Sequence, residues 1–157
     1  MKPSAIAMDV GGVALALILG ALGFQYLGHL PPCEMCHWQR WPLIAAAAIG
    51  IPSGLLLASS RDGAARLIAA PVILLVAASG AIGAYQAGVE WHWWPGPAEC
   101  TGARYVFHGL DDLNVPGAVR CDAAAWRLFG ISLAGYNALI SLGSAALGFF
   151  MLTRKAS

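Results

Sequence analysis

Four long windows of the sequence contain no Asp, Glu, Lys or Arg. They cover residues 10–33, 41–60, 67–89 and 128–153. Each is roughly 20 residues or longer, which as a helix is enough to cross the ~30 Å hydrocarbon core of a membrane. Backbone polar groups in lipid must bond to one another, so helices are the expected state. We therefore predict four transmembrane helices, at about 10–30, 41–59, 67–89 and 129–152.

The composition excludes an ordinary soluble protein. Charged residues make up 11% of the chain and hydrophobic residues 59%, whereas soluble domains carry about 25% charged residues. Four buried helices in a soluble protein would need more polar surface than this chain has. The first apolar window is long for a signal peptide and no clear cleavage site follows it. We expect an all-α fold, with residues 1–157 forming one four-helix membrane domain in a lipid bilayer.

The basic residues predict the orientation of the chain. An even number of helices places both termini on one side. That side carries Lys2, Arg61, Arg66, Arg154 and Lys155 in short segments. The other side carries Arg40, Arg104, Arg120 and Arg127 over a longer stretch. The denser basic side is the cytoplasmic one by the positive-inside rule. The net charge of +1 gives no reason to expect nucleic-acid binding.

The tryptophans agree with this division. All six lie at the predicted outer helix ends: Trp38, Trp41, Trp91, Trp93, Trp94 and Trp126. Tryptophan prefers the membrane interface, where its ring is apolar and its N–H is hydrated. The outer side has one short loop, about 30–40, and one long loop, about 90–128. In the long loop we expect the stretch WPGPAEC to be extended because of its prolines.

All four cysteines fall on the outer side. Cys33 and Cys36 lie in the short loop, and Cys100 and Cys121 lie in the long one. Disulfides persist in oxidising compartments, and four cysteines allow two disulfides with three possible pairings. Two plain structural disulfides in a non-catalytic membrane scaffold are one interpretation.

The spacing Cys33-x-x-Cys36 favours a redox role. A bridge between these residues closes a very small loop, so it constrains the chain little. At the start of the second helix, the helix N-terminus favours a thiolate. Arg40 shares a helical face with Cys36 and could stabilise a thiolate or a bound anion, or it could only snorkel to the interface.

Cys100 and Cys121 lie on what we expect to be a solvent-facing loop. A disulfide there could be a structural staple or a site of attack by an incoming thiolate. The residues alone do not choose between these roles. A zinc site is a weaker alternative, because structural sites usually present two C-x-x-C pairs and the second pair here is widely spaced.

The stretch CEMCH also matches the c-type haem attachment pattern, with His37 as the axial ligand. That alternative leaves Cys100 and Cys121 without a role. Its second axial ligand would be sought among Met35, His29, His92 and His108, and none is clearly placed. A membrane surface with a second cysteine pair nearby fits electron relay between dithiols better than a haem electron carrier.

Three stretches of the chain resemble a known family. They are PPCEMCHWQRWP, GVEWHWWPGPAECTG and CDAAAWRLFGISLAGYNALI. In this order, within four helices, they are similar to the DsbB family of bacterial inner-membrane, quinone-dependent thiol oxidases. Vitamin K epoxide reductase relatives are less similar, because their redox C-x-x-C follows the loop pair.

The resemblance implies a sequence of thiol–disulfide exchanges. A DsbA-type thioredoxin-fold oxidase attacks the Cys100–Cys121 disulfide and forms its mixed disulfide with Cys100. Cys121 then connects to Cys33, and Cys36 is left as the thiolate that faces the quinone. Electrons pass to ubiquinone or menaquinone, whose head group lies beside Arg40. The cysteines would face the periplasm and the termini the cytoplasm.

The chain departs from its relatives at one position that matters. Some relatives carry a His near the outer end of the third helix, where this sequence has Tyr85-Gln86-Ala87. Gln86 could replace that His as a hydrogen-bond donor to the quinone, or it could only pack. Glu34 and His37 also change the surroundings of the C-x-x-C pair.

Overall fold

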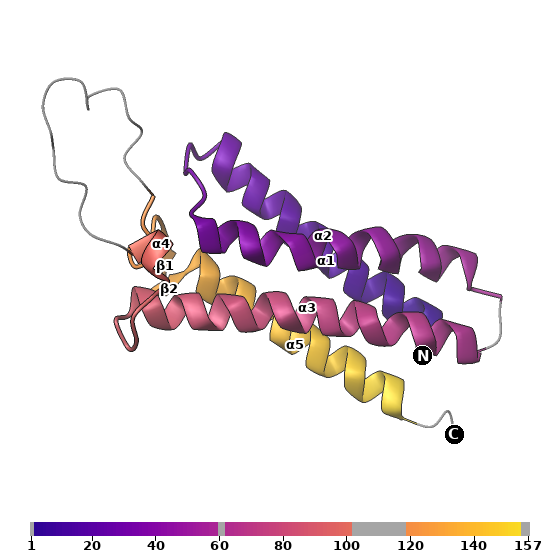
Figure 1. Ribbon diagram of the computed structural model, residues 1–157. Helices are drawn as coiled ribbons and strands as arrows, with labels where there is room; N and C mark the ends of the chain where they lie inside the picture. Colours follow the sequence, from indigo (N-terminus) through magenta and orange to yellow (C-terminus); the bar gives the residue numbers. More distant parts are fainter. Residues whose placement is uncertain (1, 60–61, 102–118, 155–157) are drawn as a thin grey trace, which may run out of the picture.

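The computed structural model describes residues 2–59, 62–101 and 119–154. Four long helices dominate it: α1 (Pro3–Tyr26), α2 (Glu34–Leu56), α3 (Asp62–Glu90) and α5 (Leu133–Thr153). The short elements are α4 (Ala98–Thr101), β1 (Arg127–Leu128) and β2 (Ile131–Ser132). The four long helices lie alongside one another in an elongated bundle. Both termini lie at the end opposite α4, β1 and β2 (Figure 1). The fold is therefore all-helical apart from one small hairpin.

Some predicted features lie outside the described residues. These are the middle of the long loop, residues 102–118, with Arg104 and His108, and the basic residues Arg61 and Lys155.

The core of the bundle is made by aliphatic side chains from all four long helices. Its buried members include Val10 on α1, Leu43 on α2, Val76 on α3 and Ala145 on α5. Small residues let α1 and α2 approach closely: a Cβ added at Gly50 would lie 2.5 Å from the backbone oxygen of Ala7. Close backbone approach through small residues is how helices associate in lipid.

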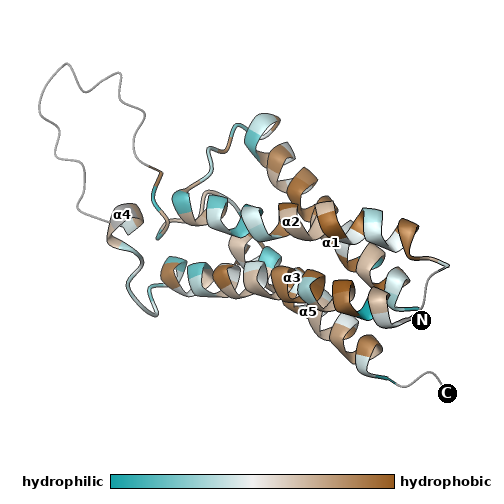
Figure 2. Ribbon diagram, turned by 45° about the vertical axis from the view of Figure 1, so that its right-hand side comes forward, coloured by the Kyte–Doolittle hydropathy of each residue, from teal (hydrophilic) through white to brown (hydrophobic). Residues whose placement is uncertain are grey.

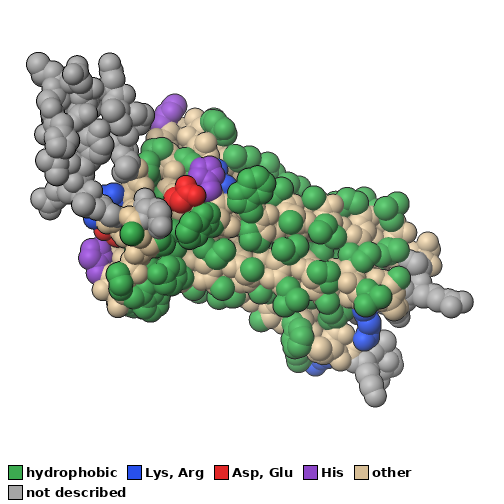
Figure 3. Space-filling view, viewed as in Figure 1, with side chains coloured by type: hydrophobic (Ala, Val, Ile, Leu, Met, Phe, Trp, Pro, Cys, Tyr) green, Lys and Arg blue, Asp and Glu red, His purple; other side chains and the backbone are tan. Residues whose placement is uncertain are grey.

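Three of the helices are long and apolar enough to cross a membrane. Within the described residues these are Pro3–Tyr26, Gly63–Glu90 and Leu133–Thr153. The space-filling view shows a largely hydrophobic body, with coloured charged and histidine side chains towards its two ends (Figure 3). The surface of the bundle thus suits lipid along its length.

The second helix, α2, is of similar length but is less apolar. It carries Glu34 and Arg40 near its start and includes Pro42 and Pro52. Figure 2 shows hydrophilic residues gathered on α2 and α3 towards the end where α4 lies. The polar part of α2 therefore belongs to one end of the bundle, and its remainder packs against α1 and α3.

Helix α2 begins seven residues before the predicted span of 41–59. Cys33 is its N-cap, and the Cys33 sulfur accepts a hydrogen bond from the backbone N–H of Cys36 at 3.3 Å. A side-chain acceptor at this position satisfies a backbone donor that the helix leaves free. The charge-free window marked only the apolar part of this helix, because Glu34 and Arg40 interrupt it. The C-x-x-C pair accordingly forms the first turn of α2.

The fourth long helix, α5, begins later than the predicted residue 129. Phe129 and Gly130 have positive φ values of 50° and 80°, which suit a tight two-residue turn. They join β1 to β2, with Leu128 paired to Ile131. Ser132 then caps α5, its hydroxyl accepting from the N–H of Gly135 at 3.2 Å. This hairpin was not predicted, because its strands are only two residues long.

The stretch WPGPAEC is only partly extended. After Pro95–Pro97 the chain makes one helical turn, α4, in which the N–H of Cys100 donates to the oxygen of Pro97 at 3.0 Å. The expectation of an extended segment is therefore wrong for its last residues. A proline can precede a helical turn because it needs no backbone donor there.

Candidate functional site

The two cysteines of the C-x-x-C pair lie against each other. Residues three apart share a helical face, and the Cys33 and Cys36 sulfurs are 2.7 Å apart. Both are free thiols. Cys33 is 4% exposed, whereas Cys36 is half-buried. Cys33 is thus the inner residue of the pair, and Cys36 is the more accessible one.

The second pair forms a disulfide. Cys100 and Cys121 are bonded, with their Cα atoms 5.4 Å apart and 21 residues between them in sequence. The N–H of Cys121 also donates to the oxygen of Cys100 at 3.1 Å. Of the three possible pairings, this is the one that the family resemblance implies.

The expected exposure of this disulfide is wrong. Cys100 is 8% exposed and Cys121 is fully buried. They pack with Cys33 and Met35 in one buried cluster, which Val119 covers from outside. A loop position predicted solvent contact, but the loop ends fold onto the start of α2 instead. Cys100 is the more accessible sulfur of the two.

The structure brings the two pairs together. The sulfurs of Cys33, Cys100 and Cys121 all lie within 4.8 Å of one another, and the Cys36 sulfur touches that of Cys33. The four sulfurs thus lead from the disulfide through Cys33 to Cys36. Disulfides exchange by direct attack of a thiolate on a sulfur. Only small side-chain shifts separate this arrangement from such an attack.

The two thiols of the C-x-x-C pair differ in acidity. Cys33 and Cys36 both lie before the apolar part of α2, which begins at Trp41, and therefore outside the predicted membrane span of 41–59. The hydrogen bond from Cys33 is the main cause that lowers the pKa of Cys36 to about 6. Burial opposes this, while the Gln86 amide, the Cys33 backbone and the Arg40 charge support it. The same contact with Cys36, together with burial, raises the pKa of Cys33 far above that of an ordinary thiol.

Gln86, which the sequence left with two possible roles, contacts both sulfurs. Its amide nitrogen lies 3.3 Å from the Cys33 sulfur and 3.6 Å from the Cys36 sulfur. The same nitrogen donates to Glu90 Oε1 at 3.2 Å. Gln86 therefore does more than pack between helices, because its amide group interacts with both thiols of the C-x-x-C pair.

A directional series of amide hydrogen bonds holds Gln86 in place. Asn137 Nδ2 donates to Gln39 Oε1 at 2.7 Å, and Gln39 Nε2 donates to Gln86 Oε1 at 2.6 Å. Ser141 Oγ donates to Asn137 Oδ1 at 2.9 Å. Each amide accepts at its oxygen and donates from its nitrogen, so the bonds polarise one another towards the thiols.

Three residues near the dithiol were not predicted from the sequence: Gln39, Glu90 and Asn137. A signal for Asn137 was present, since polar side chains inside an apolar helical window are costly in lipid and tend to serve a function. Gln39 and Glu90 sit at helix ends, where polar residues are common, so no comparable signal singled them out.

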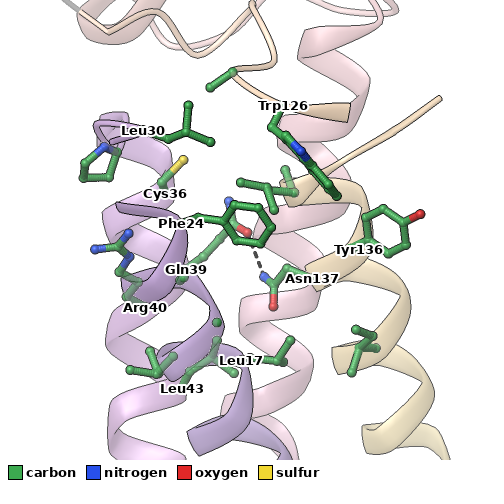
Figure 4. Close-up of a pocket in the computed structure, with 18 of the residues that line it drawn as sticks. Leu17, Phe24, Leu30, Cys36, Gln39, Arg40, Leu43, Trp126, Tyr136 and Asn137 are labelled. Atoms are coloured by element: carbon green, nitrogen blue, oxygen red, sulfur yellow. Dashed lines mark hydrogen bonds between the residues drawn. The ribbon is translucent and has the colours of Figure 1, made fainter. Parts of the chain in front are cut away.

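A cavity of about 340 Å³ opens beside Cys36. It lies between α1, the start of α2, the segment before β1, and α5. Figure 4 shows Cys36, Gln39 and Arg40 of α2 across from Trp126 and Tyr136. Most of its wall is apolar, with Leu17, Phe24, Leu30, Leu43 and Ile140 among the lining residues. A cavity of this size with few polar groups is typical of a small-molecule site.

Arg40 lies on the wall of this cavity. Its guanidinium Nη1 donates to Gln25 Oε1 of α1 at 2.6 Å, and its charge favours the Cys36 thiolate. The side chain is half-buried and held between two helices. This position differs from that of a freely snorkelling arginine.

The haem alternative is not supported. Thioether attachment would engage both Cys33 and Cys36 beside an iron held by His37. His37 is exposed, whereas Cys33 is buried against the Cys100–Cys121 disulfide. The sulfur of Cys33 therefore faces the Cys100–Cys121 disulfide and not an accessible surface.

A helical membrane bundle with a reactive dithiol against a buried disulfide defines a membrane disulfide oxidoreductase. Comparisons with known proteins agree. The family described as disulfide bond formation protein DsbB matches residues 4–151. The chain belongs to the DsbB family, and it is a membrane thiol oxidase that supports disulfide bond formation by acting on DsbA-like partners.

Individual relatives carry the same description. The chain is 34% identical over 166 residues to disulfide bond formation protein B of Albidiferax ferrireducens, covering 92% of this chain and 88% of the relative. It is 31% identical over 150 residues to that of Aromatoleum aromaticum, covering 89% of each. No solved structure matches the chain.

Proposed function

We propose that this thiol oxidase passes two electrons from a DsbA-type thioredoxin-fold oxidase to a membrane quinone, either ubiquinone or menaquinone. The observation that carries the proposal is the position of Cys33. Its sulfur lies within 4.8 Å of both sulfurs of the Cys100–Cys121 disulfide and 2.7 Å from Cys36. Cys36 in turn lines the cavity of about 340 Å³.

The first exchange takes place at Cys100. A thiolate of the reduced partner attacks Cys100, the Cys100–Cys121 bond breaks, and Cys121 leaves as a thiolate. The second thiol of the partner then attacks its own mixed disulfide and releases Cys100. The greater exposure of Cys100 relative to Cys121 supports this order.

The second exchange moves the electrons to the C-x-x-C pair. When Cys33 and Cys36 are disulfide-bonded, the Cys121 thiolate attacks Cys33 and Cys36 leaves. Cys100 then displaces Cys33, which restores the Cys100–Cys121 disulfide. A sulfur with a low pKa is the better leaving group, and Cys36 has a pKa of about 6. The described arrangement, with one disulfide and one free dithiol, corresponds to the state after this exchange.

The residues around the large cavity fit a quinone head group. Phe24 and Trp126 supply aromatic faces, and Arg40 supplies a fixed positive charge near Cys36. Gln39 and Asn137 add amide groups to the wall. A bound quinone supplies the two-electron acceptor. This chain provides the thiolate, the positive charge and an apolar site at the edge of the bundle.

We further propose that α2 is the fourth membrane span. It packs against α1 and α3, two of the helices that are long and apolar enough to cross a membrane. Four crossings place the termini together in the cytoplasm and the cysteines in the periplasm of a bacterial inner membrane, in accord with the basic residues. The aromatic residues Trp38, Trp91, Trp93 and Trp94 are all at least partly exposed at the cysteine end, where an interface would lie.

Turnover of the purified protein tests this function. The protein in detergent is mixed with a reduced DsbA-type oxidase and a quinone, and quinone absorbance is followed. We expect quinone reduction matched by disulfide formation in the partner, and loss of steady-state turnover on Cys→Ser substitution at 33, 36, 100 or 121. Undiminished turnover in any one of these variants would contradict the relay.

A further inference from the structure

One buried ionisable group has no part in the relay just proposed. Glu90, the last residue of α3, is 6% exposed. Its Oε1 accepts from the Gln86 amide at 3.2 Å. Its Oε2 is buried and has no hydrogen-bond partner of normal geometry among the described residues, although the Ser132 hydroxyl lies near enough to the carboxyl group to stabilise its charge. A buried carboxyl oxygen without a partner is costly, so its retention calls for an explanation.

A small cavity lies between this carboxyl group and the two thiols. It has a volume of about 40 Å³, and its wall includes Cys33, Cys36, Gln86, Glu90 and Ser132. Most of the wall is apolar, but Gln86, Glu90 and Ser132 supply the polar partners that a water needs, and the volume is sufficient for one. The amide nitrogen of Gln86 contacts the sulfur of Cys33 and the Oε1 of Glu90 at once. A water bound in the cavity would therefore span the gap between the Cys33 thiol and the Glu90 carboxylate.

Disulfide closure requires a base at this place. Cys36 can ionise easily, but Cys33 holds its proton tightly because of its hydrogen bond with Cys36 and its burial. Cys33 must nevertheless lose that proton when the Cys33–Cys36 bond forms. Cys33 is buried, so bulk water does not reach it freely.

We infer that Glu90 is the proton acceptor for Cys33 in the step that forms the Cys33–Cys36 disulfide. The inference rests on the proposed function for the identity of the final acceptor, a quinone. The Glu90 carboxylate takes the proton of Cys33 through one water, the sulfur–sulfur bond forms, and two electrons leave to the quinone. The protonated Glu90 then releases that proton. The reduced quinone takes up two protons, this one and one from solvent, and becomes the quinol.

The groups around Glu90 suit a residue that gains and loses a proton. Burial favours the neutral acid, while hydrogen bonding and positive charge favour the carboxylate. The charged and titratable groups that face it are Cys33 and Cys36 of α2, Arg120 on the cavity wall, Arg127 of β1 and His92. Arg127 donates to the backbone oxygen of Glu90 at 3.3 Å, and the His92 ring lies 3.2 Å from that oxygen.

Oxidation of the pre-reduced protein tests the inference with two acceptors. A quinone tests the complete step. Oxidised glutathione, a small soluble disulfide, tests closure without any quinone: the Cys36 thiolate attacks it, and Cys33 must then lose its proton to displace glutathione. Samples are quenched with acid, alkylated and weighed by mass spectrometry over a range of pH.

For Glu90→Gln, we expect closure to slow about a hundredfold with both acceptors, the lower end of what a general base contributes. The closure rate of Glu90→Gln should still rise with pH in the range where the wild-type rate no longer depends on pH. The glutathione adduct of Cys36 should accumulate, and the changed pH dependence is the result that a purely structural defect would not cause. Glu90→Asp should recover part of the rate and the wild-type pH profile.

Glu34→Gln is the matched control, because Glu34 is an exposed carboxylate beside the same motif. It should close at the wild-type rate. If Glu90→Gln does not fold, Glu90→Ala makes the same comparison with an enlarged cavity. Wild-type closure rates and pH profiles in the Glu90 variants, with no adduct, would overturn the inference.

The two proposals fail separately. If the wild-type protein reduces no quinone but Glu90→Gln still accumulates the glutathione adduct, the proposed acceptor is wrong and Glu90 retains its role. If the wild type reduces quinone and the Glu90 variants match it with both acceptors, the inference alone is wrong.

Discussion

Cys36 differs from the other three sulfurs in the donors that surround it. The Cys33 thiol, the Gln86 amide and the backbone at the start of α2 all reach its sulfur, and Arg40 adds a positive charge. Each favours the thiolate over the neutral thiol. Cys33 shares the same turn of helix, but its hydrogen bond with Cys36 and then its burial favour its neutral thiol. Adjacent cysteines thus receive different roles from their surroundings.

The acidity of Cys36 is measurable in the reduced protein. Its pKa of about 6 lies below that of a free thiol, so the thiolate is present above that pH and lost below it. We predict that alkylation of Cys36 by iodoacetamide rises through a midpoint near pH 6, while Cys33 stays unreactive. Mass spectrometry of the alkylated peptides gives the midpoint. A midpoint at the ordinary thiol value would contradict the geometry.

Gln86→Met removes the amide donor and keeps the approximate size of the side chain. Hydrogen bonds to charged groups contribute about 1.5–3 kcal/mol, and 1.36 kcal/mol corresponds to one pKa unit. We predict that the alkylation midpoint of Cys36 rises by about one pH unit or more. Ser144→Ala on α5 is the control, because its hydroxyl bonds to the backbone of Ser141 and not to the thiols. An unchanged alkylation midpoint would show that Gln86 only packs and does not stabilise the Cys36 thiolate.

At the scale of elements, the packing of α1 against α2 shapes one wall of the large cavity beside Cys36. Gly50 lies against the backbone of α1, at Ala7 and Gly11. The same helix pair then diverges enough for Leu17 and Phe24 to line the cavity opposite Cys36 and Arg40. Helix packing that depends on glycine is sensitive to any added side-chain atom, because close-packed interiors relax only partly.

Gly50→Ala should destabilise the bundle. The added Cβ would lie 2.5 Å from the Ala7 oxygen, so the helices must move apart. Overpacking of this kind costs about 1–3 kcal/mol. Gly12→Ala is the matched control, since a Cβ there meets nothing within 4 Å and alanine favours a helix. Thermal unfolding in detergent should show a lower midpoint for Gly50→Ala only. Equal midpoints for the two variants would argue against a tight crossing.

At the scale of the whole molecule, the bundle separates two ends with different chemistry. The four cysteines and the hairpin lie at one end, and both termini lie at the other (Figure 1). Three helices meet the length and hydropathy expected of a membrane span, and α2 carries the polar residues that the dithiol needs. The α2 helix is less hydrophobic than the other long helices because its first turns carry these polar residues.

The number of crossings has a simple topological test. With four spans the termini share one side, whereas with three they lie on opposite sides. We predict that epitope tags at both termini are hidden from an impermeant label in intact spheroplasts. A tag inserted between residues 110 and 111 should be labelled. Labelling of one terminus without permeabilisation would show that α2 does not cross.

Much of the fold followed from local sequence. The charge-free windows located the helices because lipid forces each segment to satisfy its own backbone. They misplaced the start of α2, since Glu34 and Arg40 belong to the helix but interrupt the apolar window. They also missed the hairpin of β1 and β2. Helix ends and two-residue strands depend on capping contacts that hydropathy does not register.

The helical membrane segments and the spacing that makes Cys33 and Cys36 one redox pair could be predicted from the amino-acid sequence, because both depend on residues within a few turns of each other. The surroundings of that pair came instead from the packing of distant helices. Gln86 lies 50 residues beyond Cys36, and Asn137 lies 98 residues beyond Gln39. The burial of the Cys100–Cys121 disulfide and the position of Glu90 likewise arise from helices packed side by side. Contacts between residues so far apart in sequence have no local pattern that could predict them.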